Sequence, residues 1–159
     1  MKPNSFNRQP KKILFTKEGY QKIKKKFQNL TEMRKEAVNR LQTAREMGDL
    51  SENGAYKAAR FELSSIDREL RRLTFQLRFG QVCEPTNNGR VDFGCRVTLD
   101  DGKKRLTFSL VGGFESDPLQ QKISINSPIG RAIMGKRMGD KVKVTAPVGQ
   151  TTYTVVEIK

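Results

Sequence analysis

The sequence predicts an α+β fold, in which a long N-terminal antiparallel α-helical coiled-coil hairpin precedes a small α+β domain. Apolar residues recur at alternating spacings of three and four in two long runs within residues 20–77, and a polar connection separates the two runs. This spacing is typical of coiled coils. Beyond residue 80 the apolar period falls to two, which is typical of short strands. The expected segments are a flexible basic tail over 1–12, the hairpin over 13–80 with an acidic tip at 48–54, and a globular domain over 81–159.

The first predicted helix follows a tail that mixes Pro, Asn, Gln and Lys without any period. Thr16 is a residue type favoured at N-caps, and Glu18 would lie in the first turn, where the helix dipole favours an acid. One polar residue, Arg34, interrupts the apolar seam of this helix. The other seam positions are Tyr20, Ile23, Phe27, Leu30, Ala37, Leu41 and Ala44.

The second predicted helix repeats the seam without interruption. Because only a few residues connect the two helices, they must be antiparallel neighbours. About thirty residues per helix give a rod of roughly 45 Å, and the alanines near the connection should make it slender there. The seam residues of this helix are Tyr56, Ala59, Leu63, Ile66, Leu70, Leu73 and Leu77.

The C-terminal half is predicted to contain short strands and one brief helix. Pro85–Gly89 is expected to be a linker, and the runs "GRVDFGCRVTL" and "KRLTFSLV" are expected to be strands around a turn at 100–102. The segment "KISINSPIGRAIMG" predicts a strand followed by a short helix, with Ser127 as N-cap and Pro128 at the first helical position. Two further strands are expected at "KVKVTAP" and "TTYTVVEIK".

The composition limits the chemistry available to the chain. The 159 residues carry a formal charge of +14, which predicts a polyanionic partner or surface, although the charge alone does not identify a DNA-reading module. Histidine is absent, and the two cysteines, Cys83 and Cys95, are separated by eleven residues. These features argue against a zinc site and against a Ser-His or Cys-His nucleophile.

No targeting segment is visible in the sequence. The first residues contain no apolar run long enough for a signal peptide, and no segment approaches the ~20 apolar residues of a membrane helix. We therefore expect a soluble, cytoplasmic protein whose cysteines are reduced thiols.

The stretch "MGDLSENGAYKAAR" at the connection admits two interpretations. In the first, Asp49 is an N-cap and Glu52, three residues later, completes a capping box. In the second, the two carboxylates face one way at a helix start and share a hard cation. Two monodentate carboxylates hold Mg²⁺ weakly, because this ion keeps its waters unless other ligands help. Such a site would work only against a partner's own metal, and the spacing alone does not choose between the interpretations.

The longer stretch "AREMGDLSENGAYKAAR" resembles the signature of the Gre-type (GreA/GreB) transcript cleavage factors of bacterial RNA polymerase. In that family the pattern Ala-Arg-x-x-Gly-Asp-x-x-Glu-Asn-x-x-Tyr lies at a coiled-coil tip. The segments "NNGRVDFG" and "ISINSPIGRAIMGKRMGDKV" are similar to the family's C-terminal domain. The resemblance extends from about Leu14 to Ile158 and implies a coiled coil followed by an FKBP-like domain.

The resemblance also implies a mechanism. The globular domain would dock at the rim of the polymerase secondary channel, and the coiled coil would enter the channel. Asp49 and Glu52 match the catalytic acids that help hold the second Mg²⁺ of the polymerase centre, which activates water to cut backtracked RNA by two-metal hydrolysis. The chain would then be an accessory factor and not an enzyme by itself. Its partners would be RNA polymerase and the 3′ segment of nascent RNA, its Mg²⁺ would be weakly held and shared, and it would be a monomer.

Other residues acquire expected roles through the same resemblance. Arg45 and Arg60 match positions where the family places basic residues that meet the extruded RNA, and Lys57 joins them; the alternative for all three is a solvated helix flank. Residues expected to support the tip are Gly48, Leu50, Ser51, Asn53 and Tyr56. Residues expected to bind the polymerase are Ser127, Pro128 and Arg131.

One departure from the family pattern keeps a second function open. Gly54-Ala55 stands where many members have Ala followed by an acid, so this tip has one carboxylate fewer. Gly54 should also loosen the first turn of the second helix by up to ~1 kcal/mol relative to Ala. Relatives with altered tips occupy the channel and inhibit, so the alternative is a non-cleaving channel modulator. A prolyl isomerase is a third hypothesis, but no aromatic-lined pocket is evident and fold alone does not confer function.

Overall fold

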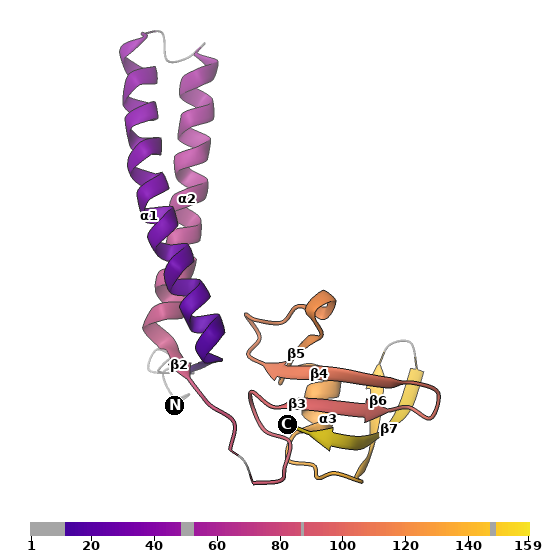
Figure 1. Ribbon diagram of the computed structural model, residues 1–159. Helices are drawn as coiled ribbons and strands as arrows, with labels where there is room; N and C mark the ends of the chain where they lie inside the picture. Colours follow the sequence, from indigo (N-terminus) through magenta and orange to yellow (C-terminus); the bar gives the residue numbers. More distant parts are fainter. Residues whose placement is uncertain (1–11, 49–52, 87, 147–148) are drawn as a thin grey trace, which may run out of the picture. The chain divides into compact units, whose positions relative to one another are not determined.

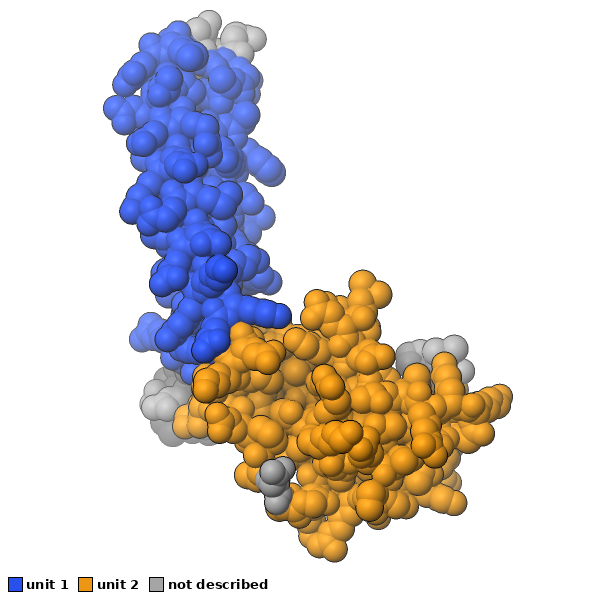
Figure 2. Space-filling view, in the orientation of Figure 1, with its two compact units in different colours: residues 1–10, 20–80 blue, residues 11–19, 81–159 orange. Residues whose placement is uncertain are grey.

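The computed structural model describes residues 12–48, 53–86, 88–146 and 149–159. Its described residues form two compact units, coloured separately in Figure 2. The first unit contains residues 20–80, and the second contains 81–159 together with 12–19. The short segment belongs to the second unit because the amide N–H of Thr16 donates to Glu115 Oε2 at 2.9 Å, and the rings of Phe15 and Phe114 stack with centroids 6.3 Å apart.

Two long antiparallel helices, α1 (Lys17–Glu46) and α2 (Gly54–Phe79), form the predicted hairpin, drawn in Figure 1. The predicted N-cap is confirmed, because the amide N–H of Gly19 donates to Thr16 Oγ1 at 3.1 Å. At the other end of α1, Gly48 has φ +77°, and its N–H donates to the carbonyl of Arg45 at 3.3 Å. This left-handed cap requires a residue without a Cβ penalty, which explains the glycine.

The apolar seam between α1 and α2 follows the predicted spacing. Its predicted positions on α2 are all buried or half-buried, and the alanines near the tip are among the most buried residues of the hairpin. Arg34, the predicted interruption, is half-exposed and donates to Asp67 Oδ1 at 2.6 Å instead of packing in the seam. The buried apolar residues of the described hairpin are Ala37, Ala44, Ala59, Ile66 and Leu73.

Ion pairs between the two helices support the seam. Because these pairs are largely exposed, each contributes only about 0.2–1 kcal/mol. The Lys26 ammonium, by donating to Glu69, lowers the pKa of that carboxyl from its ordinary value. The three pairs are Lys26 with Glu69 at 2.7 Å, Arg34 with Asp67 at 2.6 Å, and Arg40 with Glu62 at 2.7 Å.

The second unit is built on a five-stranded sheet with the order β5-β4-β3-β7-β6. Neighbouring strands are antiparallel except β4 and β5, which are parallel. The short helix α3 (Pro128–Ile133) packs against β5 and β6, and β1 (Ile13–Phe15) pairs with β2 (Gly80–Val82) in a separate two-stranded sheet. The strands of the larger sheet are β3 (Arg96–Asp100), β4 (Arg105–Val111), β5 (Lys122–Ser124), β6 (Lys141–Ala146) and β7 (Gly149–Ile158).

The core of the second unit lies on one face of this sheet. Alternate residues of the strands turn inward, as Val97 and Leu99 of β3 do, while their neighbours Arg96 and Thr98 turn outward. A bulge between Thr98 and Leu99 shifts the pairing of β3 with β7. The buried cluster contains Val91, Cys95, Val97, Leu99, Leu110, Ile133, Val142 and Val155.

One predicted strand is shorter than the sequence period indicated. Residues 90–95 are irregular apart from an isolated bridge, and regular pairing begins only at Arg96. The side chain of Asp92 accepts hydrogen bonds from Thr86 Oγ1 and from the Phe93 N–H, and these bonds lower its pKa. Gly94 follows with φ +84°. This local turn competes with the extended conformation that the alternating residues favour.

Both cysteines are free thiols, Cys95 buried and Cys83 half-buried. Among the described residues, no helix combines the length and the apolar character needed to cross a membrane.

The start of α3 provides a stability test. A Cβ added at Gly130 would lie 2.2 Å from the carbonyl oxygen of Ser124 and 2.9 Å from Cα of Ile125, and backbone atoms cannot move aside cheaply. We expect Gly130→Ala to lower the free energy of unfolding by about 1–3 kcal/mol, measured by thermal or urea unfolding. Gly54→Ala is the control, because its Cβ would meet open space, and it should raise stability by up to ~1 kcal/mol. A Gly130→Ala protein as stable as wild type would contradict the close packing described for α3.

Candidate functional site at the hairpin tip

The hairpin tip spans residues 48–54, and the structure describes its first residue and its last two. Asp49 and Glu52, the carboxylates that the sequence analysis identifies as catalytic and metal-binding, lie outside the described residues. The same is true of Leu50 and Ser51. The end of α1 and the start of α2 are described, and they show how the chain enters and leaves this segment.

Asn53 joins the two helices. Its Oδ1 accepts from the amide N–H of Tyr56 at 3.1 Å, and its Nδ2 donates to the carbonyl of Ala44 at 3.0 Å. A helix start has free N–H groups and a helix end has free carbonyls. An amide side chain offers both a donor and an acceptor, so one residue satisfies a group in each helix.

This geometry corrects the capping-box interpretation of the tip. The N-cap of α2 is Asn53, and the first helical residue is Gly54, so a box with Asp49 as N-cap is wrong. The physical reason is that the amide of Asn53 can bond both helices, whereas a carboxylate could only accept. The expectation that Asp49 and Glu52 face one way because they begin a helix loses its basis too, since both precede α2.

Arg45 and Tyr56 form a second contact between the ends of the helices. The guanidinium carbon of Arg45 lies 5.9 Å from the centre of the Tyr56 ring, a cation–π distance that contributes about 0.5–1 kcal/mol at an exposed site. Tyr56 therefore supports the tip through its ring and through the amide that Asn53 caps.

The three cations predicted to bind RNA are exposed. Lys57 and Arg60 are three residues apart on α2 and so share one face of that helix. Among the residues that the structure describes, no carboxylate lies within 4 Å of Arg45, Lys57 or Arg60, whereas three of the cations further from the tip form interhelical ion pairs. The positive charge near the tip is therefore not neutralised by the described part of the hairpin.

The described residues contain no group of three or more His, Cys, Asp or Glu side chains that could hold a metal ion. Asp49 and Glu52 lie outside this search. Their carboxylates are hard oxygen donors, which fit the chemistry of Mg²⁺, but two such ligands leave most of its coordination positions to water or to a partner.

The residues predicted to bind the polymerase lie in the second unit. Ser127 is the N-cap of α3: its Oγ accepts from the Gly130 N–H at 3.0 Å and donates to the carbonyl of Ser124 at 2.7 Å. Pro128 occupies the first helical position, as predicted. Pro128 and Arg131 are exposed and one turn apart, so they are the members of this group available to a partner, while Ser127 serves the fold.

Comparisons with known proteins cover nearly the whole chain. The family model described as "Transcription elongation factor, N-terminal" matches residues 13–82, and "Transcription elongation factor, GreA/GreB, C-term" matches residues 85–159. The chain is 37% identical over 154 residues to transcription elongation factor GreA of Neorickettsia sennetsu, with 94% of this chain and 97% of the relative covered. The GreA of Alkalilimnicola ehrlichii is 38% identical over 154 residues, with 93% and 98% covered. The crystal structure of GreA factor homolog 1 (Gfh1) of Thermus thermophilus aligns with a TM-score of 0.45 at 28% identity, covering 94% of this chain and 99% of that one.

Substitutions at Asn53 separate its two roles. Asn53→Ala removes the cap and the bond to α1, and should lower the free energy of unfolding by about 1–2 kcal/mol. Asn53→Ser keeps a favoured N-cap acceptor but cannot reach the Ala44 carbonyl, so it should cost less than Asn53→Ala. Thermal unfolding and hydrogen exchange at the Tyr56 amide measure both effects. Equal stability of the alanine variant and wild type would contradict the linking role of Asn53.

Proposed function

Because the chain belongs to the GreA/GreB family of transcription elongation factors, we propose that it inserts its hairpin into the secondary channel of bacterial RNA polymerase and stimulates cleavage of backtracked nascent RNA. Arrested complexes would thereby resume synthesis. The observation that carries this proposal is a long helical hairpin whose polar tip contains Asp49 and Glu52 and is flanked by cations without a described carboxylate partner. In this proposal the chain has no nuclease activity of its own.

The hairpin acts as a spacer of fixed length. The 30 residues of α1 give a rod of roughly 45 Å at ~1.5 Å per residue, and the seam and the ion pairs hold its two helices in one register. Asn53 then joins the helix ends beside the tip. Such a support would present the acids at the end of a stiff rod, and orientation of reacting groups lowers the barrier to reaction.

Asp49 and Glu52 are the residues that would hold Mg²⁺, together with ligands from the polymerase. When bound, the ion supplies charge stabilisation and activation of water for phosphodiester hydrolysis. The part played by this chain is to bring two negatively charged oxygen donors to the polymerase centre. Asn53 is the N-cap of α2, so the proposal does not require either acid to serve as that cap.

Arg45, Lys57 and Arg60 would bind phosphates of the RNA 3′ segment. Lys and Arg contacts to phosphate release counterions, so the affinity of these cations for RNA should fall as the salt concentration rises. Exposed Pro128 and Arg131, on α3 of an FKBP-like domain, would dock on the polymerase separately.

A non-cleaving channel modulator is the second candidate function. The first turn of α2 contains no acidic residue, and Gly54-Ala55 leaves this tip with fewer carboxylates than a three-acid tip. The two candidates give opposite results when the purified protein is added to stalled polymerase complexes carrying 3′-labelled RNA.

The acids can be tested without disturbing the fold. Asp49→Asn and Glu52→Gln should each abolish induced RNA cleavage, since an amide is a poor ligand for Mg²⁺, while the free energy of unfolding changes by no more than about 0.5 kcal/mol. Cleavage of 3′-labelled RNA in stalled complexes and thermal unfolding are the two measurements. Naked RNA with Mg²⁺ and wild-type protein should stay intact, because the polymerase must supply the rest of the site. Retained cleavage by both variants would contradict the role proposed for these carboxylates.

The cations proposed to bind RNA have their own test. The double variant Arg45→Ala/Arg60→Ala should reduce crosslinking to the RNA 3′ segment and cleavage of long backtracked transcripts by about tenfold or more, since each phosphate contact is charge-assisted. Arg68→Ala/Arg71→Ala is the matched control, because both residues are exposed on α2 away from the tip, and it should stay within about twofold of wild type. Equal losses in the two double variants would indicate that only the total charge of the hairpin matters.

A further inference from the structure

The second unit contains a cavity that the proposed function does not use. Its volume is about 490 Å³, within the range of about 300–1,000 Å³ typical of small-molecule sites. Four cations and two carboxylates line it: Lys17, Arg96, Lys122 and Lys159, with Glu18 and Glu84.

Three of these cations and one serine form a row across the end of the sheet. We name this row of Lys159, Arg96, Ser109 and Lys122 the basic row. Arg96 of β3 pairs with Ser109 of β4, and Ser109 is the register partner of Lys122 in β5. On the other side, the backbone N–H of Lys159 donates to the carbonyl of Arg96 at 2.8 Å, and the reverse bond measures 2.7 Å. Residues paired in this way point to the same face of a sheet. Their inward neighbours Val97, Ile123 and Ile158 contact the core, so the basic row faces outward.

The basic row places like charges side by side. Lys159 and Arg96 are directly opposite across two strands, an arrangement that is destabilising for like charges. Lys159 has a partner in Glu157 at 2.8 Å. Within the described part of the chain, neither Arg96 nor Lys122 has a carboxylate within 4 Å, and Glu18 and Glu84 form no ion pair with the row. A bound anion would offset this repulsion.

We propose that this cavity binds a small anion carrying two or more phosphate groups, such as a nucleoside di- or triphosphate. The guanidinium of Arg96 can bind a phosphate in a bidentate manner, Lys122 supplies a point charge, and the Ser109 hydroxyl lies between them in the row. Arg96 and Lys122 are two strands apart, about 10 Å in backbone spacing, so one phosphate does not serve both equally well. Pro85 and Val111 add apolar surface to the wall, suited to the uncharged part of the ligand.

The cavity suits a small molecule better than a strand of nucleic acid. Single-stranded nucleic acid is bound on basic surfaces that also present aromatic rings for base stacking, and no aromatic residue lines this cavity. All of the lining residues belong to the second unit, so the proposal does not depend on the hairpin tip or on the function proposed for it.

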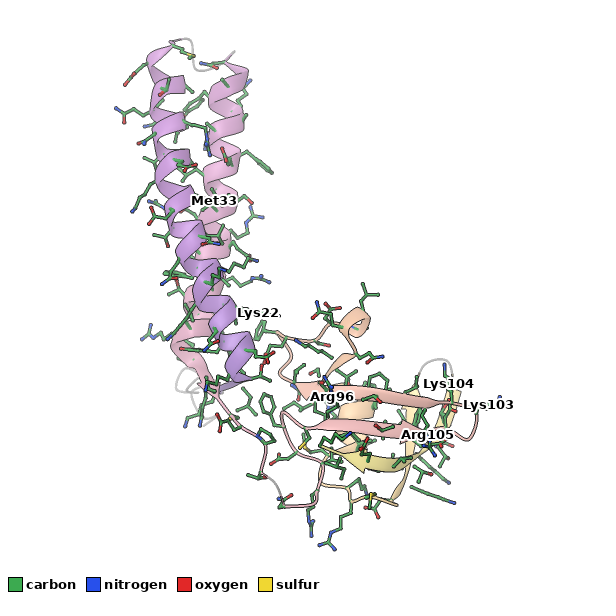
Figure 3. The ribbon with its side chains drawn as sticks, viewed as in Figure 1. Lys22, Met33, Arg96, Lys103, Lys104 and Arg105 are labelled. Atoms are coloured by element: carbon green, nitrogen blue, oxygen red, sulfur yellow. The ribbon has the colours of Figure 1, made fainter. Side chains whose placement is uncertain are left out.

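The test uses the full-length protein with inorganic pyrophosphate, ATP and GTP as probes, in calorimetric titrations at fixed salt. We expect saturable binding of one ligand per chain, weakened at least tenfold by Arg96→Ala and by Lys122→Ala. Lys103→Ala is the matched control, because this exposed lysine lies at the opposite end of the β3–β4 hairpin, as Figure 3 shows; it should leave binding within about twofold of wild type.

Thermal unfolding supplies an independent readout. Pyrophosphate should raise the melting temperature of wild type and of Lys103→Ala but not of Arg96→Ala. Without ligand, Arg96→Ala should melt at or above the wild-type temperature, since the repulsion with Lys159 is removed. If Arg96→Ala does not fold, Arg96→Gln is compared in its place.

Three results would overturn the proposal. The first is the absence of saturable binding of all three probes up to millimolar concentration. The second is an equal loss of binding in Lys103→Ala and Arg96→Ala, which would indicate attraction by overall charge. The third is binding of a short DNA duplex through Arg96 and Lys122 with no binding of the nucleotides, which would make the cavity part of a surface for a macromolecule.

Discussion

The apolar seam between α1 and α2 is the constraint on which the hairpin depends. A two-helix rod has no second layer to bury its apolar side chains, so every seam position must face the partner helix. The buried alanines Ala37, Ala44 and Ala59 meet this requirement near the tip. The seam and the ion pairs beside it stabilise the rod, and Asn53 adds a bond between the helix ends.

The ends of the helices are closed by residues other than the acids of the tip. Gly48 ends α1 with a left-handed backbone, and Asn53 starts α2 while bonding back to Ala44. The two helix ends are therefore capped by a glycine and by an asparagine side chain, neither of which carries a charge. Neither of these capping positions is occupied by Asp49 or Glu52.

The sequence predicts most of the hairpin because its physical cause is local. A threonine before an acidic first turn and a Ser-Pro pair each satisfy the start of the helix that follows them. A period of 3.5 residues marks the face of each helix that packs against the other helix. The N-cap of α2 is different. Spacing allowed Asp49, yet the choice of Asn53 depends on the Ala44 carbonyl, which belongs to the other helix. The irregular residues 90–95 were missed for a similar reason, because Thr86 binds Asp92 across the predicted linker. The roles of Asp49 and Glu52 in cleavage remain predictions from the family resemblance.

The distribution of ion pairs distinguishes cations that serve the fold from cations that are available to ligands. Lys26, Arg34 and Arg40 each pair with a carboxylate of the other helix. The cations near the tip that are proposed to bind RNA have no described carboxylate partner, and neither do Arg96 and Lys122 of the basic row, whereas Lys159 pairs with Glu157. The unpaired charges are therefore available to an anion. Part of the net charge of +14 can therefore be assigned to particular places in the structure. The group of cations in the sheet arises from the register of β7, β3, β4 and β5, which joins residues that are far apart in the sequence.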